Sequence, residues 1–167
     1  AWDFGNECNY MGKAPSAAAV SVWMNSITDV IKREDPERPL ISGMDGTALE
    51  NTIDHPENPG HSYWSASSQA ECCDILTTHH YMMWKSAGSD PCDTIKPGLF
   101  PVAEAKMYED ITNKTCFIEE IGMWRPMIAD FETAGRYLRM LYWNLWANSN
   151  GGLLWWCAFD QDNQGMA

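Results

Sequence analysis

Residues 115–122 read TCFIEEIG, and residues 2–8, near the start of the chain, read WDFGNEC. Each stretch contains a short apolar run that leads to a glutamate, Glu120 in the first and Glu7 in the second. Such runs predict buried β-strands that carry a carboxylate at their C-terminal tips. Two carboxyl groups at the tips of parallel strands are suited to hydrolysis of a glycosidic bond, one as acid and one as nucleophile or base.

Strands and helices are predicted to alternate along the rest of the chain. Pro15 opens a helical pattern that runs to about Asp35, and a long amphipathic pattern lies between Phe131 and Leu145. The predicted strands cover residues 2–7, 39–43, 73–81, 115–120 and 153–159, and a further helix covers 101–112. Repeating βα units predict an α/β fold with a parallel sheet, either wound open or closed as a barrel.

The residues around the two glutamates resemble a known signature. Asn6-Glu7 at the end of one strand and Glu120-Ile121-Gly122 at the end of a later strand are similar to the motifs of clan A glycoside hydrolases, closest to family 5. The resemblance implies a parallel (β/α)8 TIM barrel and a retaining mechanism. It also implies that Glu7 is the acid/base after strand 4 and that Glu120 is the nucleophile after strand 7.

On that resemblance, the five predicted strands are strands 4 to 8 of the barrel. A complete barrel usually has about 250 residues. We therefore expect residues 1–167 to be the C-terminal portion of a single catalytic domain, about five βα units long. The missing N-terminal half would come from the same parent chain or from another chain. The family usually has a proline after the acid/base glutamate, where this chain has Cys8.

Three further residues match motifs of the family. His79 and Tyr81 lie two apart at the tip of the third predicted strand, so they share a face. They resemble the strand-6 His-x-Tyr motif, which implies that the Tyr81 hydroxyl contacts the nucleophile and that His79 lines the active site. Asn6 would hold the 2-hydroxyl of the reacting sugar. The alternatives are a core histidine beside a core tyrosine and, for Asn6, a residue that fixes the turn.

Several tryptophans are candidates for sugar binding. Trp156 begins a Trp-x-x-x-Asp sequence similar to that of the strand-8 tryptophan of family 5, which implies a stacking platform for a sugar ring. The alternative is that Trp156 is a buried core residue, but Trp155 is the residue expected to fill that position. Trp64, Trp84 and Trp124 follow predicted strands and would line outer subsites.

Two residues compete with the site residues beside them. Glu119 precedes Glu120, and His80 follows His79. Because successive strand residues point to opposite faces, we expect only one of the two glutamates to face the pocket. The Glu-x-Gly match favours Glu120. By the same rule, His80 points away from the pocket and is structural.

Composition narrows the class of function. The formal net charge of −12 argues against a nucleic-acid partner. No apolar stretch reaches the roughly 18 residues of a membrane span, and no cofactor or metal is implied. The six cysteines are expected to be buried free thiols, with one disulfide through Cys92 as the alternative. Because the chain begins at Ala1 without a methionine, the compartment stays open, with an extracellular or periplasmic one favoured.

Two functions from different classes stay open at this stage. The first is a retaining glycoside hydrolase that cleaves a β-linked oligo- or polysaccharide by double displacement. The second is a non-catalytic carbohydrate-binding protein on a degenerate glycosidase barrel. The presence of both Glu7 and Glu120 favours the enzyme. In either case a carbohydrate is the expected partner, and the acidic composition mildly favours neutral sugars.

Overall fold

The computed structural model describes residues 1–11, 14–45, 63–81, 95–122 and 131–157. The strands in this part of the chain are β1 (Trp2–Asp3), β2 (Leu40–Ile41), β3 (Leu76–His79), β4 (Cys116–Ile121) and β5 (Leu153–Trp155). The helices are α1 (Cys8–Met11), α2 (Ala17–Glu34), α3 (Ala66–Cys72), α4 (Lys96–Thr112) and α5 (Phe131–Ala147). None of the helices in the described ranges is long and apolar enough to cross a membrane.

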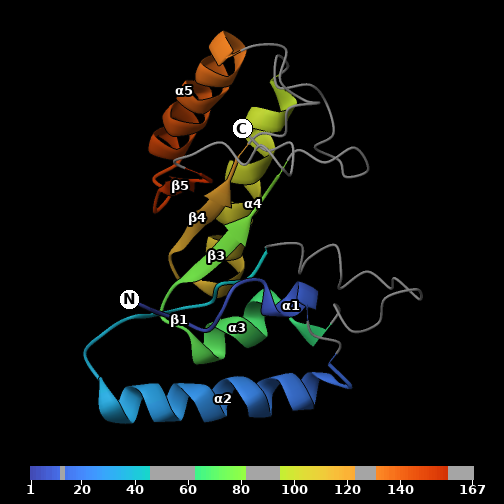
Figure 1. Ribbon diagram of the computed structural model, residues 1–167, viewed down its shortest axis with the longest axis vertical. Coiled ribbons are helices and arrows are strands. Elements are labelled where there is room, and N and C mark those ends of the chain that lie inside the picture. Colours follow the sequence, from blue (N-terminus) through green and yellow to red (C-terminus); the bar gives the residue numbers. More distant parts are fainter. Residues whose placement is uncertain (12–13, 46–62, 82–94, 123–130, 158–167) are drawn as a thin grey trace.

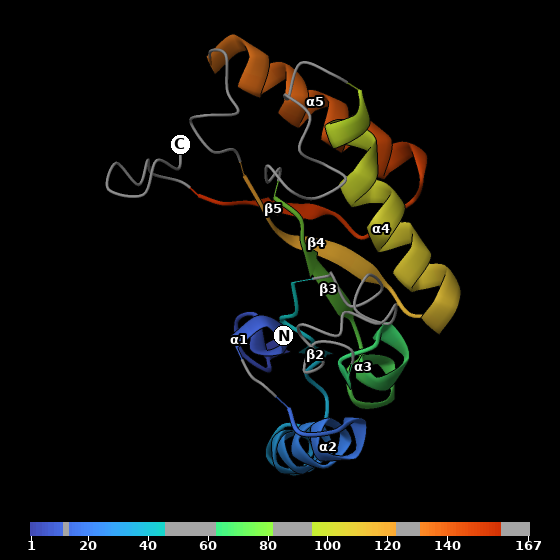
Figure 2. The ribbon, with the colours of Figure 1, turned by 90° about the vertical axis from the view of Figure 1, so that its right-hand side faces the viewer.

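Each strand lies beside the next strand of the sequence, and all the pairs are parallel. β1 pairs with β2, and β3, β4 and β5 pair in that order. A parallel bridge between Ile41 and Ile75 joins the two groups, with a 3.1 Å hydrogen bond from the Ser42 amide to the Ile75 carbonyl. The helices α2, α3, α4 and α5 follow one another along one side of the strands (Figures 1 and 2). The predicted α/β class with a parallel sheet is therefore confirmed.

The core lies between these helices and the strands. Met24 on α2, Leu76 on β3, Tyr108 on α4, Ile118 on β4 and Leu141 on α5 are all fully buried. They come from each successive βα unit, so burying their apolar surface holds the units against one another.

The helix boundaries follow local capping chemistry. The Ser16 hydroxyl accepts a 3.1 Å hydrogen bond from the Ala19 amide and so caps α2, one residue after the predicted start at Pro15. The prediction for α4 was wrong at its start, because the helix begins at Lys96 rather than at Pro101. Pro101 has no N–H for the Pro97 carbonyl one turn earlier. The Tyr137 hydroxyl on α5 donates to that carbonyl instead, at 3.2 Å.

The cysteines in the described ranges form no disulfide, as predicted, although Cys8 and Cys157 are only partly buried. Cys73 and Cys116 are buried, and burial raises the pKa of the Cys73 thiol to about 12. Such thiols stay protonated and unreactive at neutral pH. Cys92, the candidate for a disulfide, lies outside the described residues.

Candidate active site

Glu7 is carried on a backbone that departs from a regular strand. Ladder pairing of β1 stops at Asp3, four residues earlier than predicted, but the Glu7 amide still donates to the Gly43 carbonyl at 2.7 Å. Gly5 has φ of 135° and Glu7 has φ of 51°, in the left-handed region that favours glycine. A Cβ at Gly43 would lie 2.5 Å from the backbone carbonyl oxygen of Gly5, so the close approach of these two segments requires glycine at this position.

A buried amide–carboxylate pair fastens the segment after Glu7 to the neighbouring strand ends. The side-chain amide of Asn9 donates to the carboxylate of Asp45, and the Asp45 amide donates back to the Asn9 side-chain oxygen at 3.1 Å. The Asp45 carbonyl in turn accepts a 3.0 Å hydrogen bond from the backbone amide of His79. Asn9 and Asp45 are both buried, so this clamp fixes the spacing between Glu7 and β3.

A bulge at the end of β4 places both of its glutamates near the same histidine. Thr78 pairs with Ile118, but the next residue, His79, pairs with Glu120, so β4 contains one extra residue. A matching irregularity lies on the β5 side. The strict alternation assumed for these two glutamates was therefore wrong, because the inserted residue of a bulge breaks the alternation of side chains. Glu119 and Glu120 both approach the His79 ring.

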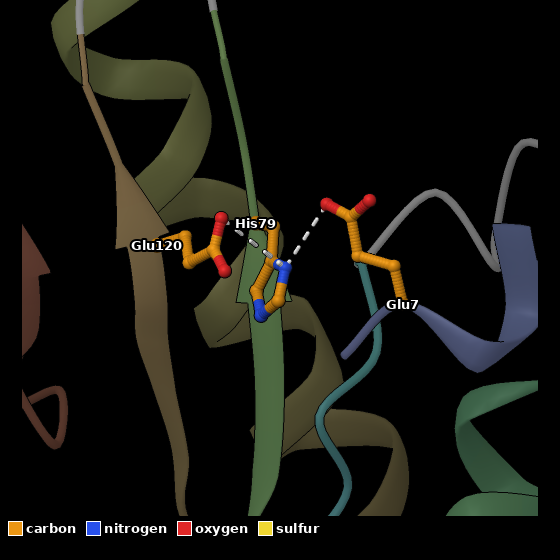
Figure 3. A group of neighbouring side chains, drawn as sticks. All are labelled: Glu7, His79 and Glu120. Atoms are coloured by element: carbon orange, nitrogen blue, oxygen red, sulfur yellow. Dashed lines mark hydrogen bonds and ion pairs between the residues drawn. The ribbon is translucent and has the colours of Figure 1, made fainter. Parts of the chain in front are cut away.

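His79 lies between three carboxylates (Figure 3 draws two of them). Its Nδ1 is 3.1 Å from Glu7 Oε1 and 3.9 Å from Glu120 Oε2, and its Nε2 is 3.2 Å from Glu119 Oε2. A neutral imidazole donates from one nitrogen only, so donation to carboxylates on both sides requires the charged imidazolium. Burial lowers the pKa of His79, but the hydrogen bonds to Glu119 and Glu7 and the negative charge nearby outweigh burial and raise it to about 9.

Tyr81 contacts the proposed nucleophile. Its hydroxyl donates a 2.8 Å hydrogen bond to Glu120 Oε2. Burial and this hydrogen bond raise the pKa of Tyr81 well above its usual value, which keeps the hydroxyl protonated and therefore a donor. This is the contact that the family resemblance implied.

The arrangement brings the two candidate catalytic carboxylates together from distant parts of the chain. Glu7, His79 and Glu120 each offer one side-chain atom that could bind a metal ion, and these three atoms lie within 4.8 Å of one another. A metal ion fits such a set by distance alone. However, carboxylates face both ring nitrogens, and hydrogen bonds from a protonated ring account for the cluster, so we assign no metal to it.

Trp156 stands at the tip of β5, beside the end of β4. Its indole is 40% exposed, and its amide donates to the Ile121 carbonyl at 2.8 Å. Trp155 packs against the core, as expected. Exposure leaves Trp156 able to stack on a sugar, and the platform role stays a prediction. Asn6 is an exposed turn residue before Glu7, and its contact with sugar is likewise untested.

The tryptophans proposed for outer subsites have different outcomes. Trp64 is buried, and its ring packs edge-on against that of Trp23 with centroids 5.7 Å apart. The prediction that Trp64 lines an outer subsite was therefore wrong, because its ring is packed into the hydrophobic core beside α2. Trp84 and Trp124 lie outside the described residues.

His80 points away from the site, as predicted. Its ring lies 4.4 Å from that of Phe100, and its Nδ1 is 3.3 Å from a carboxylate oxygen of Glu104. Both partners are on α4, so His80 belongs to the packing between β3 and that helix.

Four residues near the site were not anticipated as part of it. They are Asp3, Asn9, Asp45 and, as a contact of His79, Glu119. An acidic residue at the start of each apolar run, or an Asx residue after it, is too common in sequences to mark a site. Only pairing between strands brings them together.

Several solved structures are similar to this chain. An endo-β-1,4-mannanase from Thermotoga petrophila matches with a TM-score of 0.70 at 16% identity, over 99% of this chain and 37% of the other. An exo-β-1,4-mannosidase from an Opitutaceae bacterium matches with a TM-score of 0.72 at 20% identity, over 93% and 28%. A family 5 (GH5_18) protein from Streptomyces cattleya matches with a TM-score of 0.76 at 16% identity, over 96% and 39%.

These matches cover nearly all of this chain, which spans well under half the length of the structures that it matches. Neither a protein-family model nor a curated protein sequence matches it. Identities of 16% to 20% establish the fold, and the resemblance predicted from the strand-end motifs is confirmed at that level. The chain thus has the fold of part of a (β/α)8 barrel like those of family 5 glycoside hydrolases.

Proposed function

We propose that residues 1–167 are the C-terminal portion of the catalytic domain of a retaining β-glycoside hydrolase. The observation that carries the proposal is the convergence of Glu7, in the turn after β1, and Glu120, near the end of β4, whose nearest carboxylate oxygens lie within 4.8 Å. Retaining glycosidases have their two carboxyl groups about 5–5.5 Å apart, whereas inverting enzymes need about 6.5–9.5 Å. An approach of single carboxylate oxygens to within 4.8 Å is compatible with the shorter separation of retaining enzymes, in which a carboxylate attacks directly.

The reaction proceeds in two steps on this proposal. Glu120 attacks the anomeric carbon while Glu7 donates a proton to the departing glycosidic oxygen, which leaves a covalent glycosyl–enzyme. Glu7, now ionised, takes a proton from water, and the resulting hydroxide displaces Glu120 with net retention of configuration. The Tyr81 hydroxyl, 2.8 Å from Glu120 Oε2, orients the nucleophile for the first step.

Substrate contacts come from the same end of the sheet. Trp156 would stack on the apolar face of the sugar in the reacting subsite. Asn6 would hold its 2-hydroxyl, and Trp124 would line an outer subsite. Since similar structures include an endo-β-1,4-mannanase and an exo-β-1,4-mannosidase, β-linked mannosides are the substrates to test first. The remaining barrel strands would come from the missing N-terminal half.

The experiment separates the roles of the two glutamates in the protein that carries the complete barrel. We expect Glu120→Ala to lose turnover on every aryl glycoside, because no covalent intermediate forms without the nucleophile. We expect Glu7→Ala to lose about 10²–10⁴-fold on substrates with poor leaving groups, and much less with an activated aryl group that departs without protonation.

Added azide gives a sharper readout than rate alone. It should rescue Glu7→Ala with retained configuration, since a small anion attacks the intermediate without a general base. With Glu120→Ala it should give an inverted product, because azide enters from the nucleophile's side. Glu132→Ala, an exposed glutamate on α5, is the matched control and should keep wild-type rates. Wild-type turnover by Glu120→Ala would overturn the proposal.

A further inference from the structure

A third carboxylate, Glu119, lies behind the two glutamates and has no part in the proposed reaction. The bulge in β4 turns it toward the His79 ring, where its Oε2 is 3.2 Å from Nε2. Its side chain is only 14% exposed. Partial burial and the negative charge of Glu119 raise the pKa of Asp3 on β1.

This carboxylate determines which way the imidazole ring can donate. The His79 side chain is 1% exposed, so water has little access to replace a lost partner. With Nε2 bound to Glu119, Nδ1 is left to face Glu7 at 3.1 Å and Glu120 at 3.9 Å. A neutral ring has a single N–H and could serve only one side.

We propose that Glu119 is a positioning residue that keeps His79 as an imidazolium with its Nδ1–H aimed at the two catalytic carboxylates. On the β2 side of β3, the carboxylate of Asp45 accepts a hydrogen bond from Asn9. The charged groups that interact with His79 are Glu7 and Asp3 from the segment around β1, and Glu119 and Glu120 from β4. All four are acidic. The catalytic consequence rests on the proposed function, whereas the hydrogen bond to Glu119 does not.

The consequence for catalysis follows from the atoms involved. A hydrogen bond from His79 holds Glu7 Oε1, which leaves Oε2 as the oxygen that carries the proton to the leaving group. The positive charge lies 3.1 Å from Glu7 Oε1 and 3.9 Å from Glu120 Oε2, so it favours the ionised form of both carboxylates. Glu120 needs that form as the nucleophile of the first step, and Glu7 needs it as the base of the second. Loss of the His79 charge would remove both effects together.

The test measures the pKa of His79 by NMR titration of the complete protein labelled at histidine, with the signal identified by its loss in His79→Gln. We expect Glu119→Gln, which keeps the shape but removes the charge, to lower the pKa of His79 by about one unit or more. Asp3→Asn should lower it by less, because Asp3 supplies charge without a hydrogen bond to the ring. Glu132→Gln is the matched control and should leave it unchanged.

A kinetic measurement accompanies the titration. In Glu119→Gln, kcat should fall above the pH at which NMR shows His79 losing its proton, with KM little changed. An unchanged His79 pKa in Glu119→Gln overturns the proposal, and if that variant does not fold, an unchanged pKa in Glu119→Ala does so. Should Glu120→Ala remain active, the proposed function fails, while the NMR titration still decides the role of Glu119.

Discussion

The charge on His79 predicts how the stability of the protein changes with pH. Hydrogen bonds and nearby carboxylates raise the pKa of His79 to about 9 from an ordinary 6.5. The difference of about 2.5 units, at about 1.4 kcal/mol per unit, corresponds to about 3.5 kcal/mol of stabilisation. Because the folded pKa is the higher one, this stabilisation is complete below about pH 6.5 and is lost as the pH rises through about 9.

The measurement is the free energy of unfolding by urea, followed by tryptophan fluorescence at pH 6, 7.5, 9 and 10. His79→Gln, which does not titrate, is the reference, and subtracting its values removes the contributions of cysteines that titrate in both proteins. We expect the advantage of the wild type over the variant to fall by about 3 kcal/mol across this range. A difference that stays constant, or that grows as the pH rises, would refute the assignment of a charged His79.

Three further predictions follow from contacts at the strand ends. Gly122→Ala should lower Tm and activity together, because a Cβ there would lie 2.2 Å from the Trp156 carbonyl oxygen, and calorimetry with an activity assay checks this. Trp156→Ala should raise KM for an oligosaccharide far more than Trp156→Phe, which keeps an aromatic face. Residues 1–167 expressed alone should associate, because β1 and β5 have open edges, and a monodisperse monomer in analytical ultracentrifugation would contradict this.

Much of the sheet could be predicted from the sequence, because each strand is an apolar run with a clear end. β1, β2, β3 and β5 lie within the predicted ranges, and β4 extends one residue past the predicted end, to Ile121. His79 and Tyr81 reach the site because they alternate with the buried Thr78 and with His80. That alternation requires only the regular geometry of a strand. The family motifs added the order of the strands in a barrel, which periodicity alone could not.

The arrangement around Glu119 could not be predicted for a definite reason. A bulge is one residue of mismatch between two strands, so it depends on the register of both partners rather than on the local sequence of one. Nothing in the run from Cys116 to Ile121 marks it, since that run contains neither glycine nor proline. The hydrogen-bonded pair of Asn9 and Asp45 could not be predicted either, because the two residues are 36 positions apart in the sequence and meet only when their segments pair in the fold.

Both glutamates reach the site through departures from regular backbone. Glu7 has φ of 51°, a conformation that costs a non-glycine residue of order 1–3 kcal/mol. Without the bulge in β4, strict alternation would put Glu120 on the side of Ile118, which is buried toward the helices, and far from Glu7. A fold selected for stability alone would have no reason to keep either feature. Their presence at the two carboxylates, with His79 held between them, argues that the strand ends are shaped for chemistry at this point.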